Sequence, residues 1–190
     1  LIFMSLFFVA QSLSADIWVE KEKGTLRRSV STPQRLPVLL GAKVAASAAI
    51  MASVSGIALV VGVLAFDVRP ARLRAALLWT TFGGSALLCC FLFLQVLGTT
   101  QRGANLITTM FVFPLIMLGG SFFPFDIMPP WMAAIGRWTP NGMAVTGTKS
   151  LMFGQPDYSA IALAALVIGG FAVAAFLGCL SRLRGRFLSS

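Results

Sequence analysis

The chain has 190 residues, of which 57% are hydrophobic and only 11% are charged. Soluble domains carry about 25% charged residues, so this composition excludes an ordinary soluble globule and indicates one domain surrounded by lipid. The net charge of +9 comes from 15 Lys and Arg against 6 Asp and Glu, and these basic residues lie between apolar runs. That placement favours a role in membrane topology over nucleic-acid binding.

The first predicted span covers residues 1–17, and Gln11 and two serines lower its hydropathy. Leu1 lies inside the apolar run, without the basic flank that a signal peptide would have. We therefore expect an N-terminally truncated chain.

The segment 18–37 follows, and it is the only strongly polar stretch of any length. Thr25 is suited to cap a short helix that begins near Leu26, and Pro33 would end that helix. Leu26 and Val30 form an i,i+4 apolar pair that would fit a groove on a partner. A basic loop that only sets the topology and touches lipid headgroups is the alternative interpretation.

Three further spans are predicted at 38–66, 75–98 and 105–120, since a spanning helix needs about 17–25 residues. The third of these is short. Small residues are dense in these runs, and small faces let membrane helices approach closely. The three cysteines also lie in apolar runs without metal-ligand spacing, so we interpret them as small hydrophobic residues.

The segment 121–148 is too rich in proline to continue a helix and too apolar for an ordinary loop. Non-helical backbone at membrane depth is tolerated only where protein or a water-filled cavity satisfies it. We therefore expect two short helices joined by turns, with Trp131 and Trp138 as interfacial anchors. An apolar loop between two spans is the alternative.

The last span is predicted at 159–180, and a basic tail follows at 181–190. Ten basic residues lie in the first and third connections and the tail, against five in the second and fourth. The positive-inside rule therefore places the 18–37 loop and the C-terminus in the cytoplasm and the 121–148 segment outside. The second connection, which this rule places outside, departs from the expected charge distribution because it holds Arg69, Arg72 and Arg74.

Two motifs resemble those of ABC-2 type transporter permeases. The pattern Gly-Gly-x-Phe-Phe-Pro-x-x-x-Met-Pro-x-Trp, followed by Thr-Pro, resembles the hairpin before the last helix of that family. The pattern Glu-x-x-x-Gly-Thr, then Pro, then Gly-x-Lys, resembles its cytoplasmic loop, which carries a short helix that docks on the ATPase. The resemblance implies these ATPase-coupling residues: Glu20, Gly24, Thr25, Leu26, Arg27, Arg28 and Pro33. It implies these hairpin residues: Gly119, Gly120, Phe123, Pro124, Met128, Pro129, Trp131, Thr139 and Pro140.

The resemblance implies an all-α integral membrane bundle of about five transmembrane helices, the last five of a six-helix permease. It also implies a permease subunit that exports a drug, a lipid-like or another amphipathic molecule. The expected partners are an ABC ATPase, which would hold the ATP and Mg, a second permease copy or homologue, and the lipid bilayer. The expected location is a bacterial inner membrane.

Two other function classes remain as alternatives. The first is an intramembrane enzyme with Ser85, Ser121 or Thr139 as nucleophile, but the chain has no histidine and no intramembrane lysine to activate one. The second is a channel or structural subunit without ATP coupling. The sequence has no phosphate-binding loop of its own, and the predicted spans from 38 onward hold no Asp, Glu, Lys or Arg except Lys43 near one end. Ion-coupled carriers usually need such residues, so we expect the energy to come from another subunit.

Overall fold

The structure is a computed structural model that describes residues 2–23, 36–66, 72–153 and 156–188. Every regular element in these ranges is helical, which confirms the predicted all-α membrane bundle. The helices are α1 (Ile2–Glu22), α3 (Leu36–Phe66), α4 (Leu73–Leu97), α5 (Gln101–Leu118), the 3-10 turn η1 (Phe125–Ile127), α6 (Pro130–Trp138), α7 (Pro140–Phe153) and α8 (Tyr158–Leu188).

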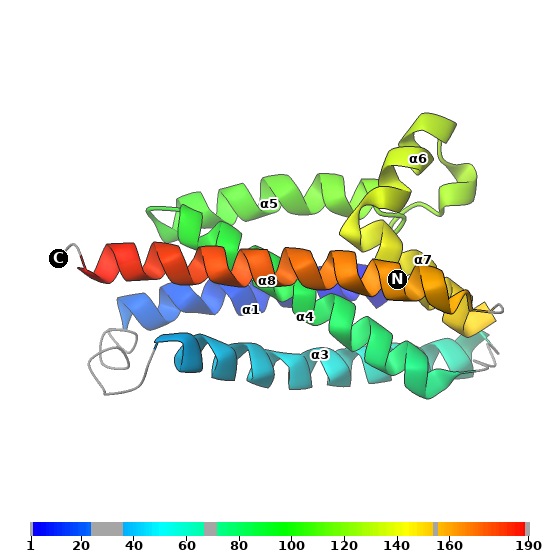
Figure 1. Ribbon diagram of the computed structural model, residues 1–190, viewed down its shortest axis with the longest axis horizontal. Coiled ribbons are helices and arrows are strands. Elements are labelled where there is room, and N and C mark those ends of the chain that lie inside the picture. The colour runs from blue at the N-terminus through cyan, green and yellow to red at the C-terminus, as the bar shows by residue number, and fades with distance from the viewer. Residues whose placement is uncertain (1, 24–35, 67–71, 154–155, 189–190) are drawn as a thin grey trace.

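The long helices lie side by side along one axis (Figure 1). Among the described residues, α1, α3, α4 and α8 are long and apolar enough to cross a membrane. α5 runs beside them but has only 18 residues, and it contains polar side chains such as Asn105 and Thr109. The short helices α6 and α7 gather at one end of the bundle, which we call the hairpin end.

α4 is the central helix, because it contacts α1, α3, α5, α7 and α8. In its second half four consecutive residues, Ala86 to Cys89, are all buried. Successive residues of a helix point about 100° apart, so this part of α4 is covered on every side. Gly83 and Gly84 permit the close approach, since a Cβ on Gly84 would lie 3.3 Å from the Met51 sulfur.

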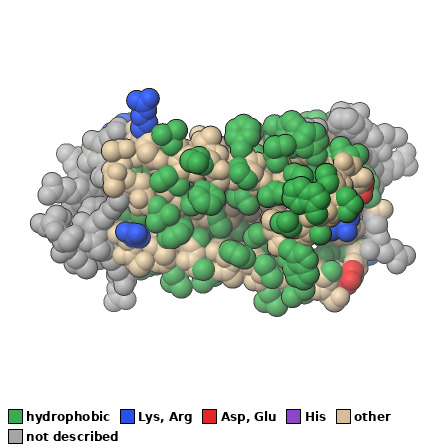
Figure 2. All heavy atoms as spheres, turned by 90° about the horizontal axis from the view of Figure 1, so that it is seen from above, with side chains coloured by type: hydrophobic (Ala, Val, Ile, Leu, Met, Phe, Trp, Pro, Cys, Tyr) green, Lys and Arg blue, Asp and Glu red, His purple; other side chains and the backbone are tan. Residues whose placement is uncertain are grey.

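The outside of the bundle is apolar where lipid would surround it. Figure 2 shows hydrophobic side chains over the middle of one face and the charged side chains toward the two ends. Large apolar residues are exposed on three different helices, including Leu64, Met110 and Leu166, which are 74–80% exposed. A water-soluble protein would rarely expose so much continuous apolar surface, whereas a bilayer favours it.

Candidate functional site

The chain reverses direction where α5 ends, and glycine makes the reversal possible. The Gly119 N–H donates to the Leu115 carbonyl at 2.9 Å and closes the last turn of α5. Gly120 follows with φ of 72°, a left-handed conformation that favours glycine. A Cβ on Gly120 would also overlap the ring of Phe125, which is buried beneath the turn. The backbone path therefore requires glycine at position 120 of the predicted hairpin motif.

Asn141 joins the two sides of this reversal. Its side chain is 1% exposed, and its Nδ2 donates to the Leu115 carbonyl at 3.0 Å and to the Ser121 hydroxyl at 2.9 Å. The Ser121 hydroxyl in turn lies 3.2 Å from Asn141 Oδ1, to which it donates. A Cβ on Gly119 would occupy the position of the Asn141 carboxamide. One side chain thus ties the start of α7 to the end of α5.

The turn between α6 and α7 is held by Thr139. Its hydroxyl donates to the Gly136 carbonyl at 2.7 Å and accepts from the Gly142 N–H at 3.0 Å. Thr139 is therefore the N-cap of α7, and Pro140 stands at the first helical position, where its missing N–H costs nothing. Gly136 and Gly142 let the two helices touch, because a Cβ on Gly142 would overlap the Gly136 carbonyl.

The hairpin is fixed to the bundle through α4. The Trp79 indole N–H donates to the Ala144 carbonyl at 2.9 Å, and the indole lies against Gly147, where a Cβ would overlap it. A buried indole N–H generally needs such a partner. α7 is thereby anchored to the central helix of the fold.

α6 turns an apolar face outward. Trp131, Ile135 and Trp138 are 66%, 54% and 75% exposed, at the i, i+4 and i+7 spacing of one helix face. Ala133 and Gly136 form its buried face. This amphipathic pattern with tryptophans is typical of a helix that lies in a membrane interface.

The other predicted hairpin residues occupy the connection between α5 and α6. The exposed Phe123 ring packs edge-on against Phe122 with 4.9 Å between centroids. Pro124 and Met128 flank η1, and Pro129 immediately precedes α6. The structure therefore brings Gly119, Gly120, Thr139 and Pro140 into one packed centre, and it leaves Phe123 and Trp131 on the surface.

The hydroxyls considered as nucleophiles have structural partners. Ser121 and Thr139 hydrogen-bond within the hairpin as described above, and the Ser85 hydroxyl donates to the Thr81 carbonyl at 2.8 Å. None of these bonds joins a hydroxyl to a basic side chain, as an activated nucleophile would require.

At the opposite end of the bundle, Glu20 of α1 meets Lys43 of α3. Glu20 Oε1 and Lys43 Nζ lie 2.8 Å apart, and the side chains are 42% and 17% exposed respectively. The pair closes the base of the predicted coupling loop, because α1 and α3 are the helices on either side of it. The other predicted coupling residues lie outside the described residues: Gly24, Thr25, Leu26, Arg27, Arg28 and Pro33.

The sequence matches the family model of the ABC-2 type transporter over residues 1–153. The chain belongs to the ABC-2 type transporter family. The match includes the polar loop, the hairpin turn and the Asn141 centre, and it ends in the last residue of α7. No curated protein and no solved structure shows a significant match. Members of this family are membrane transport subunits that have no ATPase site of their own and work with an ABC ATPase.

This ABC-2 chain also carries a polar contact between α1 and α5 that hydropathy does not predict. Gln11 Nε2 donates to the Thr109 hydroxyl at 3.1 Å, and Thr109 is exposed. Deeper in the bundle, Gln95 Nε2 of α4 donates to Asn105 Oδ1 of α5 at 3.0 Å. Polar side chains inside a membrane are often functional. The residues of these two pairs were therefore candidate functional residues that the sequence interpretation did not single out.

Asn141 is the residue that sequence reasoning missed most clearly. Its signal was present, because an amide side chain follows a Thr-Pro capping pair and lies between Gly136 and Gly142. Glycines on both sides of a polar residue in an apolar segment indicate close backbone contact around it.

Proposed function

We propose that this chain is the membrane-spanning half of an ATP-driven exporter, and that its ATPase, holding ATP and Mg, is a separate chain or domain. The membership in the ABC-2 family supports the transport role, and the 18–37 loop would receive the ATPase. The complete transporter would contain two permease halves, because the transport path of this family forms between them. A bacterial inner membrane, with the C-terminus in the cytoplasm, agrees with the distribution of basic residues.

The Glu20–Lys43 ion pair is the single observation that best supports energy coupling through this loop. A 2.8 Å contact joins the two helices that flank the loop, so a force applied to the loop would reach both α1 and α3. Both helices pack against α4. The pair is partly shielded from solvent, which weakens screening by salt and favours a persistent contact.

The face formed by α1 and α5 would line the transport path. There the Gln11–Thr109 pair and the exposed Ser12 supply polar atoms, while Phe8 and Met110 supply exposed apolar surface. A face with both characters suits an amphipathic cargo better than a purely polar solute. A second copy facing this surface would enclose it.

The substitution Leu26→Asp tests the proposed coupling. It would place an unpaired charge in a packed groove of the ATPase, at a cost of about 2–5 kcal/mol of binding free energy. We expect normal membrane insertion, with loss of ATPase co-purification and of transport. Ser31→Asp, which adds the same charge within the same loop, is the matched control and should retain both. Unchanged ATPase affinity in the Leu26→Asp protein would show that the loop serves topology alone.

A further inference from the structure

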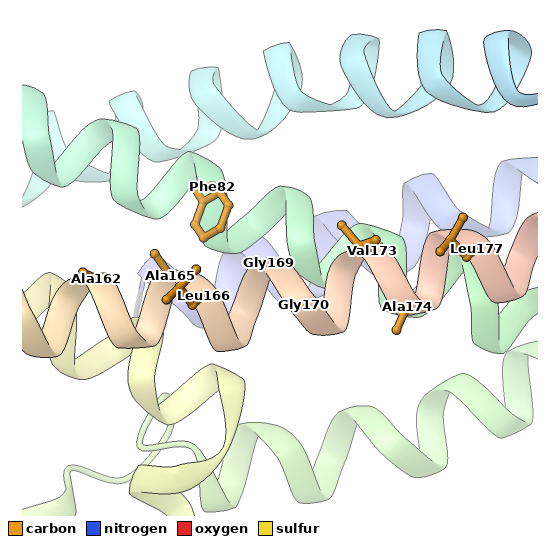
Figure 3. A pocket seen from close by; sticks show the side chains of 9 residues that line it. All are labelled: Phe82, Ala162, Ala165, Leu166, Gly169, Gly170, Val173, Ala174 and Leu177. Atoms are coloured by element: carbon orange, nitrogen blue, oxygen red, sulfur yellow. The ribbon is translucent and has the colours of Figure 1, made fainter.

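An apolar groove runs along α8 where it packs beside α4. Its volume is about 960 Å³, and every residue that lines it is apolar or glycine. Figure 3 shows the Phe82 ring of α4 between the two helices, beside the Gly169–Gly170 pair of α8. A Cβ on Gly170 would meet no atom within 4 Å, so the groove is open above this glycine.

A second hollow of about 360 Å³ continues this groove toward the hairpin end. It shares Phe82 and Ala165 with the first hollow, and Trp79 and Tyr158 also line it. The two hollows therefore form one apolar furrow along α8. Tyr158 and Gly170 are twelve residues apart, which corresponds to about 18 Å of helix.

The furrow has a basic rim at the hairpin end. The Arg72 guanidinium lies over the Tyr158 ring, 5.5 Å from its centroid. Arg74 is also exposed, one turn before Leu78, which lines the second hollow. Asp157, which precedes Tyr158, is engaged by α8, since its Oδ1 accepts from the Ser159 hydroxyl at 2.6 Å and from the Ser159 and Ala160 N–H groups. Because two arginines stand against one acid among these described residues, the charge at this end of the furrow is positive.

We propose that the furrow binds an anionic phospholipid of the leaflet at the hairpin end. Its phosphate would lie at Arg72 and Arg74, and an acyl chain would follow α8 as far as Gly169 and Gly170. The length agrees, because about 18 Å covers half of a hydrocarbon core of about 30 Å together with part of the interface. A helix of a second copy would cover the apolar part of the furrow but would supply no phosphate for the arginines.

The test measures lipid binding by the full chain in mixed micelles with native mass spectrometry. The probes are dioleoyl phosphatidylglycerol and dioleoyl phosphatidylcholine, titrated separately. We expect one tightly retained phosphatidylglycerol, bound at least about five-fold more strongly than phosphatidylcholine. Arg72→Ala and Arg74→Ala should each lower phosphatidylglycerol affinity about five-fold, as expected for one cation near an anionic headgroup. Phosphatidylcholine affinity should not change.

Two matched controls separate the furrow from the rest of the surface. Arg137 also lies over a ring, 5.8 Å from the Phe125 centroid, but outside the furrow, so Arg137→Ala should leave lipid affinity unchanged. Gly170→Leu should fill the furrow and weaken both lipids. Gly62→Leu, at another glycine with open space around it, should weaken neither.

Several results would overturn the proposal. They are equal affinity for the two lipids, an Arg137→Ala effect as large as that of Arg72→Ala, and lipid binding that Gly170→Leu leaves intact. If Gly170→Leu dissociates a dimer without changing lipid retention, the furrow seats a second copy and the lipid assignment is wrong.

Discussion

Replacing Asn141 by alanine should release the hairpin from α5. The side chain is 1% exposed and takes part in three hydrogen bonds with the Leu115 carbonyl and the Ser121 hydroxyl. Each such bond contributes about 0.5–1.5 kcal/mol net, and polar contacts between membrane helices average nearer 0.6 kcal/mol. The substitution also leaves Ser121, which is 8% exposed, without its partner. We expect Asn141→Ala to lower the unfolding free energy by about 2–4 kcal/mol.

The assay is equilibrium unfolding in mixed micelles, followed by tryptophan fluorescence, since Trp79, Trp131 and Trp138 lie in or against the hairpin. Ser121→Ala is the matched comparison, because it keeps the Asn141 bond to Leu115, and it should cost about 1 kcal/mol. The double variant should cost less than the sum of the two single variants, because both remove the same bonds. A loss below about 0.5 kcal/mol for Asn141→Ala, or strict additivity, would refute this account of the hairpin.

Three further predictions concern other parts of the chain. Gly136→Ala should lower stability by about 1–3 kcal/mol in the same unfolding assay, because its Cβ would overlap the Leu118 carbonyl, and wild-type stability would contradict the close packing of α6. Cysteines placed at Ser31 and at Ser159 in a cysteine-free chain should react with impermeant reagents from the cytoplasmic and external sides respectively, and external labelling at Ser31 would reverse the proposed topology. The Ser159 hydroxyl and the backbone N–H groups of Ala160 and Ser159 hold the pKa of the Asp157 carboxyl below its ordinary value of 3.8. This stabilisation is present above pH 3.8 and is lost as the pH falls through the lowered pKa. The protection factors of the amides at the start of α8, taken relative to an unstructured chain at the same pH, should therefore fall in acid, and Asp157→Ala should abolish that dependence.

The fold class followed from hydropathy, because lipid requires long apolar helices whose backbone groups are satisfied internally. α3 covers Leu36–Phe66 where the apolar run suggested 38–66, and α8 begins at Tyr158 where 159 was expected. The break in the helices at Pro124, Pro129 and Pro140 could also be predicted from the sequence, because proline lacks the backbone N–H donor that a helix needs.

The contacts between helices could not be predicted from hydropathy. Hydropathy indicates that α4 and α7 are apolar, but it does not predict that the Trp79 indole donates to the Ala144 carbonyl. The Gln95–Asn105 and Gln11–Thr109 pairs depend on the rotation of each helix about its axis. Packing sets that rotation, and packing depends on residues far apart in the chain. The loop motif identified Glu20, yet only the structure showed that Lys43 is its partner.

The burial of the α4 stretch from Ala86 to Cys89 restricts how this permease can assemble. Residues buried among the helices of their own chain offer no contact to another subunit, so the proposed second permease half would have to bind elsewhere on the surface. α1, α3, α5 and α8 all keep large apolar side chains on the surface, including Phe8, Leu64, Met110 and Leu166. Within α4 the surface is uneven, because Leu78 in its first half is 72% exposed while Ala86 to Cys89 are buried. One chain thus combines a buried segment that maintains the fold with outer helix faces that remain available for assembly.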